Sequence, residues 1–287
     1  MDPVLLPMSR RELIRALATS WPARKIREAT RGTGDDVPPE LLRFTLPVPG
    51  LDRRLDGLRI GQLSDVHVGA MLTPRYIRTS LAVFGRHMPD ILCITGDLLD
   101  DPLMARATFD LLTEHPAPYG TFYSLGNHEN FMDRPRIIRE ARTHDRLRLV
   151  LNEAVVVSVQ GAPVHVSGVD YPVGQGATAP RDETNRQNAE NATAHAVDAE
   201  FRVALAHHPD DFDFIADRGV ELTLSGHTHG GQVAPIGNLL QERFYKYFYG
   251  RYTRGRSTLH VNGGTGHSFP LRVGVPAEVT EITLVRA

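Results

Sequence analysis

Several Asp, Asn and His side chains directly follow short apolar runs in this chain. In Gly226-His227-Thr228-His229, two imidazoles stand one residue apart between glycines, just after the apolar run at 221–225. Similar clusters occur at Asp65 and His67, at Asp97, at Asn127 and His128, and at His207. Oxygen and nitrogen donors without thiolate suit Mn, Fe, Zn or similar divalent ions rather than a structural zinc. The clusters therefore predict a site that binds metal ions.

The elements that must position these clusters form a repeating pattern. Strands are predicted at 58–64, 90–95 and 121–125, with helices between them at 74–87 and 102–114. This alternation is typical of parallel strands with crossover helices. Because parallel strands end at one edge of a sheet, where open α/β folds bind ligands, we expect the clusters to converge. Each cluster alone could be an ordinary capped turn or a buried histidine, but five in this order make coincidence a poor explanation.

The second half of the chain predicts a second sheet. Residues 155–159 and 164–169 flank a turn at 160–163 and predict a β-hairpin. Further strands are predicted at 201–206 and around Leu222, Leu259 and Ile282, whereas the polar segment 172–200 predicts a loop with a short helix. The turn-rich segment 32–50 predicts a connector with an edge strand near 41–46. We therefore expect two packed sheets flanked by helices.

The composition is that of a globular protein with one large α/β domain. The chain has 287 residues, of which 41% are hydrophobic and 23% charged. A formal net charge of -2 gives no general attraction to nucleic acid, which is not expected as a stable partner. The single cysteine, Cys93, excludes an intrachain disulfide and is expected to pack as a small hydrophobe.

The N-terminal residues allow two interpretations. Residues 9–14 resemble a twin-arginine export signal, but Arg15 interrupts the apolar region that must follow it. The same residues fit an amphipathic helix with Leu13, Leu17 and Trp21 on one face, and the basic segment 9–25 suits peripheral contact with an anionic membrane surface. Docking on the parent domain fits equally well. No apolar run is long enough to cross a bilayer. We expect a cytoplasmic or peripheral membrane protein, with twin-arginine-like export as the alternative.

The five blocks, taken in order, resemble a known family. Asp-x-His, Gly-Asp, Gly-Asn-His-Glu, His and Gly-His-x-His are similar to the calcineurin-like metallophosphoesterases over residues 58–287, and the tail at 263–278 resembles a bacterial branch of small membrane-associated or exported phosphodiesterases. The resemblance implies an α/β fold with a two-sheet β-sandwich flanked by helices. It divides the chain into an N-terminal helical appendage and connector (1–50) and a catalytic domain (51–287). The chain departs from the family at Glu129, where Asp is more usual, and at 264–267.

The resemblance also implies a site with two divalent metal ions, with Mn favoured over Fe or Zn. Asp65, His67 and His229 would bind one ion, and Asn127, His207 and His227 would bind the other. Asp97 would bridge both ions. His207 is preferred to His208 because the first histidine of the family's His-x-Pro segment carries the ligand. His128 would act near the leaving-group oxygen as general acid or phosphoryl donor, or would orient Asp97 instead.

The implied activity is phosphoester hydrolysis by in-line attack of a hydroxide that bridges the metals. Its substrate would be a phosphodiester or a pyrophosphate-linked lipid precursor. The alternatives are a phosphomonoesterase or protein phosphatase and, with less support, a catalytically silent binding scaffold. The aromatic and basic segment 239–252 follows His229, and four of its residues are predicted to contact a substrate that could be lipid-linked: Arg243, Tyr245, Lys246 and Arg251. The alternative is a helix whose aromatic side chains face the core.

Overall fold

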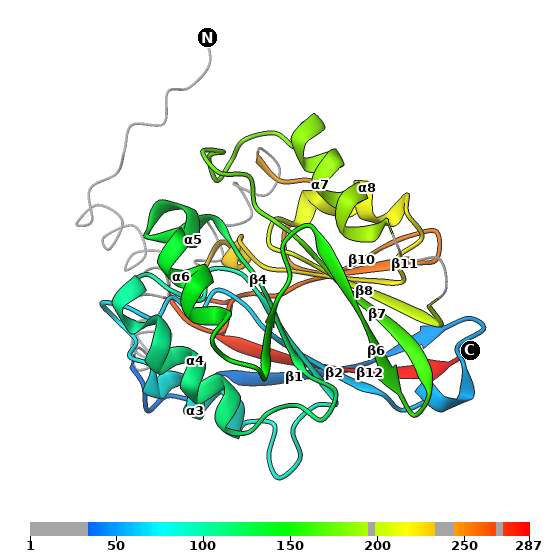
Figure 1. Ribbon diagram of the computed structural model, residues 1–287, viewed down its shortest axis with the longest axis horizontal. Helices are drawn as coiled ribbons and strands as arrows, with labels where there is room; N and C mark the ends of the chain where they lie inside the picture. The colour runs from blue at the N-terminus through cyan, green and yellow to red at the C-terminus, as the bar shows by residue number, and fades with distance from the viewer. Residues whose placement is uncertain (1–33, 195–198, 233–243, 268–271) are drawn as a thin grey trace.

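Two six-stranded sheets pack face to face, with helices on both outer faces (Figure 1). This computed structural model describes residues 34–194, 199–232, 244–267 and 272–287. The arrangement confirms the predicted α/β sandwich. The predicted membrane-surface helix and export motif, and also Arg243, lie outside the described residues. Within those residues, no helix is both long and apolar enough to cross a membrane.

The first sheet has the strand order β1-β12-β2-β3-β4-β5. Its strands are β1 (Glu40–Val48), β2 (Arg59–Leu63), β3 (Ile91–Thr95), β4 (Thr121–Ser124), β5 (Leu147–Leu149) and β12 (Glu278–Arg286). Strands β2, β3 and β4 run parallel, as predicted, and β5, which was not predicted, joins β4 in the same direction. The predicted edge strand is β1, which pairs with β12 along its whole length. The division of the chain at residue 50 stays a prediction.

Helices α3 (Arg75–Ala82) and α4 (Ala105–Glu114) connect the parallel strands of the first sheet. The 3-10 helix η2 (Pro102–Met104) precedes α4, and the short helices α5 (Asn127–Phe131) and α6 (Arg134–Ala141) follow β4. The predicted crossovers are thus confirmed, although α3 ends at Ala82 instead of continuing to residue 87. There the chain turns at Gly85, which has a φ of 81°.

The second sheet has the order β10-β11-β9-β8-β7-β6. Its strands are β6 (Glu153–Val159), β7 (Ala162–Val169), β8 (Phe201–Ala206), β9 (Leu222–Ser225), β10 (Gly250–Arg254) and β11 (Ser257–Val261). The predicted hairpin is β6–β7, but its turn is only two residues long. Gln160 and Gly161 have φ values of 50° and 83°, as a two-residue turn between twisted strands requires, so Ala162 and Pro163 belong to the strand.

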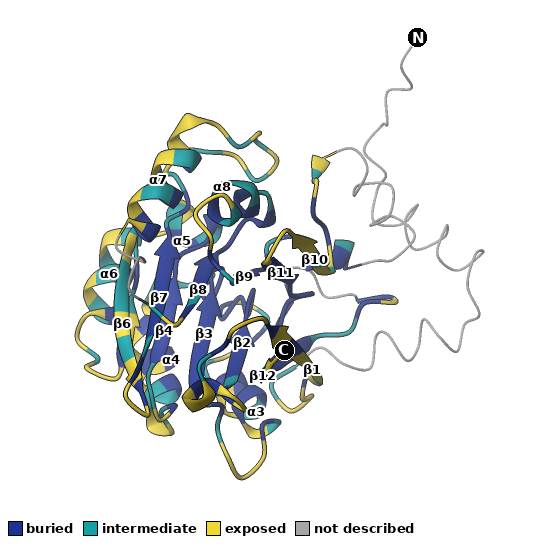
Figure 2. Ribbon diagram, turned by 90° about the vertical axis from the view of Figure 1, so that its right-hand side faces the viewer, coloured by how far each residue is buried: buried dark blue, intermediate teal, exposed yellow. Residues whose placement is uncertain are grey.

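Apolar cores on both sides of the sheets fix the positions of the strand ends. Figure 2 shows the central strands buried, whereas the edge strands β1, β6 and β10 are partly exposed. Cys93 packs between the sheets as a small hydrophobic residue, as expected, together with Phe122, Phe201 and Leu224. Helices α3 and α4 cover the first sheet; α7 (Glu183–Thr193) and α8 (Phe212–Ala216) cover the second. Removing this apolar area from water stabilises the frame by about 25 cal/mol per Å².

Candidate metal centre

All seven predicted ligands meet at the edge of the sandwich where the parallel strands end. Each follows a strand end by one to four residues, on β2, β3, β4, β8 or β9: Asp65, His67, Asp97, Asn127, His207, His227 and His229. Six of the seven side chains belong to buried residues, and His227 is of intermediate exposure. The strand ends therefore bring together residues that lie up to 164 positions apart in the sequence (229 minus 65).

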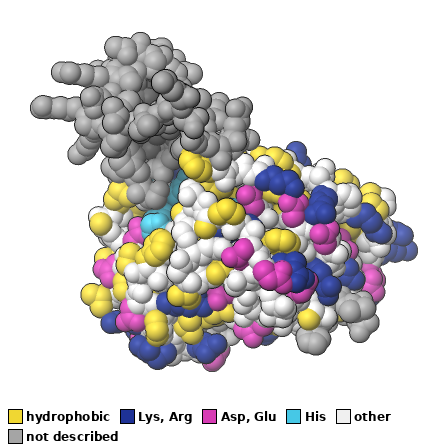
Figure 3. All heavy atoms as spheres, turned by 90° about the horizontal axis from the view of Figure 1, so that it is seen from above, with side chains coloured by type: hydrophobic (Ala, Val, Ile, Leu, Met, Phe, Trp, Pro, Cys, Tyr) yellow, Lys and Arg dark blue, Asp and Glu magenta, His cyan; other side chains and the backbone are white. Residues whose placement is uncertain are grey.

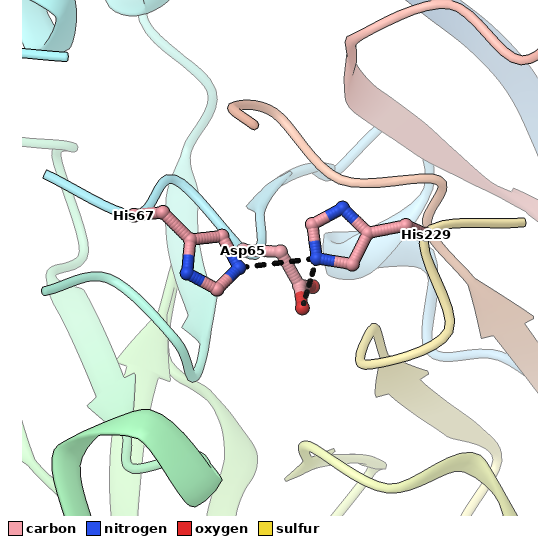
Figure 4. A group of neighbouring side chains, drawn as sticks. All are labelled: Asp65, His67 and His229. Atoms are coloured by element: carbon pink, nitrogen blue, oxygen red, sulfur yellow. Dashed lines mark hydrogen bonds and ion pairs between the residues drawn. The ribbon is translucent and has the colours of Figure 1, made fainter. Parts of the chain in front are cut away.

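The first ligand cluster consists of Asp65, His67 and His229. The Nε2 atoms of His67 and His229 are 3.1 Å apart, and Nε2 of His229 lies 3.3 Å from Oδ1 of Asp65. Figure 4 shows the three side chains pointing toward one another, Asp65 and His67 from the loop after β2 and His229 from a separate segment. One ligand atom from each residue lies within 4.8 Å of the others, so a single ion could contact all three.

The second ligand cluster consists of Asn127, His207 and His227. Nδ1 of His227 lies 2.8 Å from Oδ1 of Asn127 and 3.2 Å from Nε2 of His207. Nε2 of His207 is 3.1 Å from the same amide oxygen. The other ring nitrogen of His207 lies 2.7 Å from the carbonyl oxygen of Thr95, which fixes the orientation of the ring.

Asp97 lies between the two clusters. Its Oδ2 atom is 3.2 Å from Nε2 of His207 in the second cluster and 4.0 Å from Nε2 of His67 in the first. One carboxylate oxygen thus faces ring nitrogens of both clusters, as a bridging ligand would.

The chemistry of these donors fits divalent cations. Imidazole nitrogens that face each other at 3.1 Å need a shared proton or a cation between them. Burial raises the pKa of Asp65, but the positive charges of His229 and His207 outweigh it and hold that pKa below its usual range. Burial likewise opposes ionisation of Asp97, and His207 together with His67 keeps its pKa low. The site therefore holds two buried anions beside imidazoles, a donor set that suits Mn, Fe or Zn.

The histidines of the second cluster differ in proton affinity. Burial lowers the pKa of His207, but the charges of Asp97 and Asp65 raise it to about 10. Burial and the neighbouring charge of His207 lower the pKa of His227 to about 3. Metal binding here must therefore displace the proton of His207, because only a deprotonated ring nitrogen is a ligand.

The backbone of the site is strained. Of the eight non-glycine residues with positive φ among those described, five are predicted ligands: Asp65, His67, Asp97, His227 and His229. Such conformations are rare away from glycine and cost of order 1–3 kcal/mol each, so they persist where the surrounding structure fixes them. The concentration of this strain at one edge marks a functional site.

Glycine is required where two of these loops touch. A Cβ at Gly126 would lie 2.6 Å from the backbone nitrogen of Asp97. A Cβ at Gly226 would overlap Ser64 and Asp65. The glycines of the Gly-Asn-His and Gly-His-x-His blocks therefore permit a close approach of the ligand loops.

His128 stands at the opening of the site. Its Nδ1 lies 2.8 Å from Oδ1 of Asp100, and its Nε2 lies 3.9 Å from Oδ2 of Asp97. Its side chain is 30% exposed, unlike the side chains of the buried ligands. Burial lowers the pKa of His128, but the hydrogen bond to Asp100 and the charge of Asp97 raise it to about 9. Its Nε2 therefore carries a proton near neutral pH and can donate it.

Three residues that support the site were not predicted. Asp100 accepts hydrogen bonds from Nδ1 of both His67 (2.9 Å) and His128 (2.8 Å), which turns both Nε2 atoms inward; its place three residues after Asp97 could have indicated it. The carboxylate of Glu129 accepts hydrogen bonds from four backbone N–H groups, including that of Asp97. The buried Arg272 lies 3.2 Å from Nδ1 of His229 and donates to surrounding carbonyl oxygens; it belongs to the tail at 263–278, whose resemblance gave it no role at the site.

The structure places only one of the described substrate-contact candidates beside the clusters. The ring of Tyr245 lies 5.7 Å from that of His227 and 5.5 Å from that of His208, and Tyr171 packs against the same histidines. Lys246 pairs instead with Asp213, and Arg251 lies 4.6 Å above the ring of Phe44. Residues 245–249 are not helical, but Tyr247 and Phe248 are buried, so the alternative is wrong about the helix here and right about aromatic side chains that face the core.

Two donor clusters that share one carboxylate, at the strand ends of an α/β sandwich, are the arrangement of a metal-dependent hydrolase. The sequence profile of the calcineurin-like phosphoesterases matches residues 58–231. The chain belongs to this family, whose members act on phosphoesters at a dinuclear divalent metal site.

Bacterial relatives match most of the chain. An uncharacterized metallophosphoesterase of Campylobacter jejuni is 30% identical over 86% of this chain, which spans 63% of the relative's length. The uncharacterized metallophosphoesterase YkuE of Bacillus subtilis is 28% identical, with 85% of each chain covered. The phosphodiesterase YaeI of Escherichia coli is 27% identical over 78% of this chain and 80% of its own.

Proposed function

We propose that this protein hydrolyses phosphodiesters, with two divalent metal ions held by the two ligand clusters and bridged by Asp97. The observation that carries the proposal is the position of Asp97, whose Oδ2 faces His207 at 3.2 Å and His67 at 4.0 Å. Support for a diester substrate comes from the related phosphodiesterase of Escherichia coli. A pyrophosphate-linked lipid precursor is a second substrate class, in which the same in-line attack at phosphorus would cleave a phosphoanhydride bond instead of an ester bond.

The bound ions would supply Lewis acidity for the attacking water and for the phosphoryl oxygens. The protein's own residues set the geometry around them. Asp65 and Asp97 are buried and provide the anionic charge that would hold two cations there. His128 presents a protonated Nε2 toward Asp97 at 3.9 Å, where it can donate to the leaving-group oxygen. Asp100 keeps that ring in place through Nδ1.

A pair of chromogenic substrates tests the proposal. Protein loaded with Mn should hydrolyse bis(p-nitrophenyl) phosphate with a higher kcat/KM than p-nitrophenyl phosphate, and a chelator should abolish both rates. Asp97→Asn should abolish activity and lower metal content, whereas Asp110→Asn, on the exposed face of α4, serves as the matched control. A preference for the monoester would instead favour a phosphomonoesterase. Absence of hydrolysis with Mn, Fe and Zn would favour a silent scaffold.

A further inference from the structure

Large exposed apolar side chains gather beside the candidate site. Among the described residues, the four most exposed large hydrophobic side chains are Val173 (70%), Leu103 (69%), Phe131 (59%) and Val156 (59%). The first three lie on connections that leave strands of the ligand-bearing edge, and Met132 (38%) adjoins them. Val156 lies on β6, the edge strand of the second sheet. We name Leu103, Phe131, Met132 and Val173 the apolar rim.

Contacts between side chains and between helices tie the rim to His128. The ring of Phe131 lies 6.1 Å from that of His128. Leu103 lies three residues after Asp100, the hydrogen-bond partner of His128. Leu103 belongs to η2, which contacts α6, and α6 begins two residues after Met132.

Further contacts extend the rim to the second ligand cluster. Val173 follows Tyr171, whose carbonyl oxygen accepts a 2.8 Å hydrogen bond from Asn130 of α5 and whose ring lies 6.0 Å from that of His207. Figure 3 shows histidine side chains at the surface with hydrophobic side chains beside them. The rim thus adjoins the site on the His128 side through Phe131.

The charges beside the rim favour an apolar ligand over an anionic one. Arg134, which follows the rim on α6, is held by Asp170 at 2.6 Å. Arg181 lies 5.2 Å above the ring of Tyr171, and its side chain is only 5% exposed beside Asp211. Both cations are therefore engaged within the protein. While they face water, the rim side chains contribute little to the stability of the fold. They contribute hydrophobic free energy only when a ligand covers them.

We propose that the apolar rim binds a hydrocarbon arm of the substrate, so that the site takes phosphodiesters with one apolar ester group. In a ligand whose phosphorus lies at the ligand clusters, an arm that leaves past His128 would run along Phe131, whose ring lies 6.1 Å from that of His128. The inference rests on the proposed phosphodiesterase function and adds to it the chemical class of one ester arm.

A homologous series of substrates tests the inference. The full-length protein loaded with Mn is assayed on glycerol phosphodiesters whose second arm is methyl, butyl or octyl, all below their critical micelle concentrations, with every product quantified by mass spectrometry. We expect kcat/KM to rise about two- to fourfold for each methylene that the rim covers. Phe131→Ser and Leu103→Ser should lower the octyl rate more than the methyl rate. Val156→Ser, an equally exposed control on β6, should change neither rate.

Each outcome of this series decides a separate point. A rate that is independent of chain length in the natural protein overturns the inference but leaves the phosphodiesterase function in place. Rim variants that keep the full dependence of kcat/KM on chain length also overturn the inference. Variants that lose only their binding to lipid vesicles overturn it too, because the apolar rim would then bind a membrane instead of a substrate arm. Failure to hydrolyse any member, including the methyl ester, refutes the proposed function itself.

Discussion

Replacing Glu129 by Gln tests how the loop that carries Asp97 is held in place. The Glu129 side chain is fully buried. Its Oε1 accepts hydrogen bonds from the backbone N–H groups of Leu98 (2.7 Å) and Leu99 (3.1 Å), and its Oε2 from those of Asp97 (3.0 Å) and Gly126 (2.7 Å). One carboxylate thus joins the turn after β3 to the start of α5.

The size of the effect follows from this hydrogen-bond pattern. Gln has the same shape as Glu, but one of its oxygens is replaced by an NH₂ group that would face two N–H donors. Each buried donor left without an acceptor costs about 1–3 kcal/mol, so the free energy of unfolding should fall by about 2–6 kcal/mol. That is a large part of the roughly 5–15 kcal/mol that stabilises a typical domain. The pair of Glu114 with Arg78 provides a control, because it is exposed to solvent and Glu114→Gln should leave the free energy of unfolding nearly unchanged.

Urea unfolding of the metal-free variants, followed by circular dichroism, measures this difference. Manganese retained after dialysis should fall as well for Glu129→Gln, since Asp97 loses a backbone anchor, and should stay at the wild-type level for Glu114→Gln. If the two variants unfolded within about 1 kcal/mol of each other, Glu129 would not be holding the Asp97 loop, and the reasoning from its four acceptor contacts would be refuted.

Three further substitutions test proton transfer, metal binding and the pH dependence of stability. His128→Ala should lower kcat by about 10²- to 10⁴-fold with unchanged manganese content; an undiminished rate would exclude His128 from proton transfer. Arg272→Met should weaken metal retention by the first ligand cluster, because its guanidinium lies 3.2 Å from Nδ1 of His229; wild-type retention in equilibrium dialysis would contradict this. Burial raises the pKa of Asp211 from 3.8 to about 7, so the folded protein keeps a proton there that the unfolded chain releases near pH 4. Stability should therefore fall as pH rises between about 4 and 7, and Asp211→Asn should remove that fall in urea midpoints measured from pH 5 to 8.

Much of the fold could be predicted because its strands are buried apolar runs with polar ends. The predicted strand at 201–206 matches β8 (Phe201–Ala206), and the crossover pattern of β2, β3 and β4 follows from alternation alone. Which strands pair with each other was harder to predict from the sequence. The edge strand near 41–46 was predicted, but its partner β12 lies more than 230 residues away, as the contact between Arg43 and Glu281 illustrates. Neighbours at such a separation are chosen by packing and not by local pattern.

The ligands were more predictable than the residues that support them. A ligand reveals itself by its type and by its position after a strand. The role of Glu129 depends on backbone amides, which leave no trace in a sequence, and that of Arg272 on a contact with His229 across 43 positions. A related limit applies to the basic residues after His229, which the sequence predicts to contact the substrate. The direction of a side chain depends on the local backbone, and Lys246 and Arg251 point to Asp213 and Phe44.

The organisation of the site explains why its supports matter as much as its ligands. Five ligand residues have positive φ, and the buried carboxylates of Asp65 and Asp97 repel each other, so the metal-free site opposes its own assembly. The cores on both sides of the sheets hold the strand ends but end where the loops begin. Beyond that point, Asp100, Glu129 and Arg272 hold the loops through hydrogen bonds to imidazole nitrogens, backbone amides and carbonyl oxygens. None of these three is a predicted ligand, yet together they keep the two clusters close enough for one carboxylate to face both.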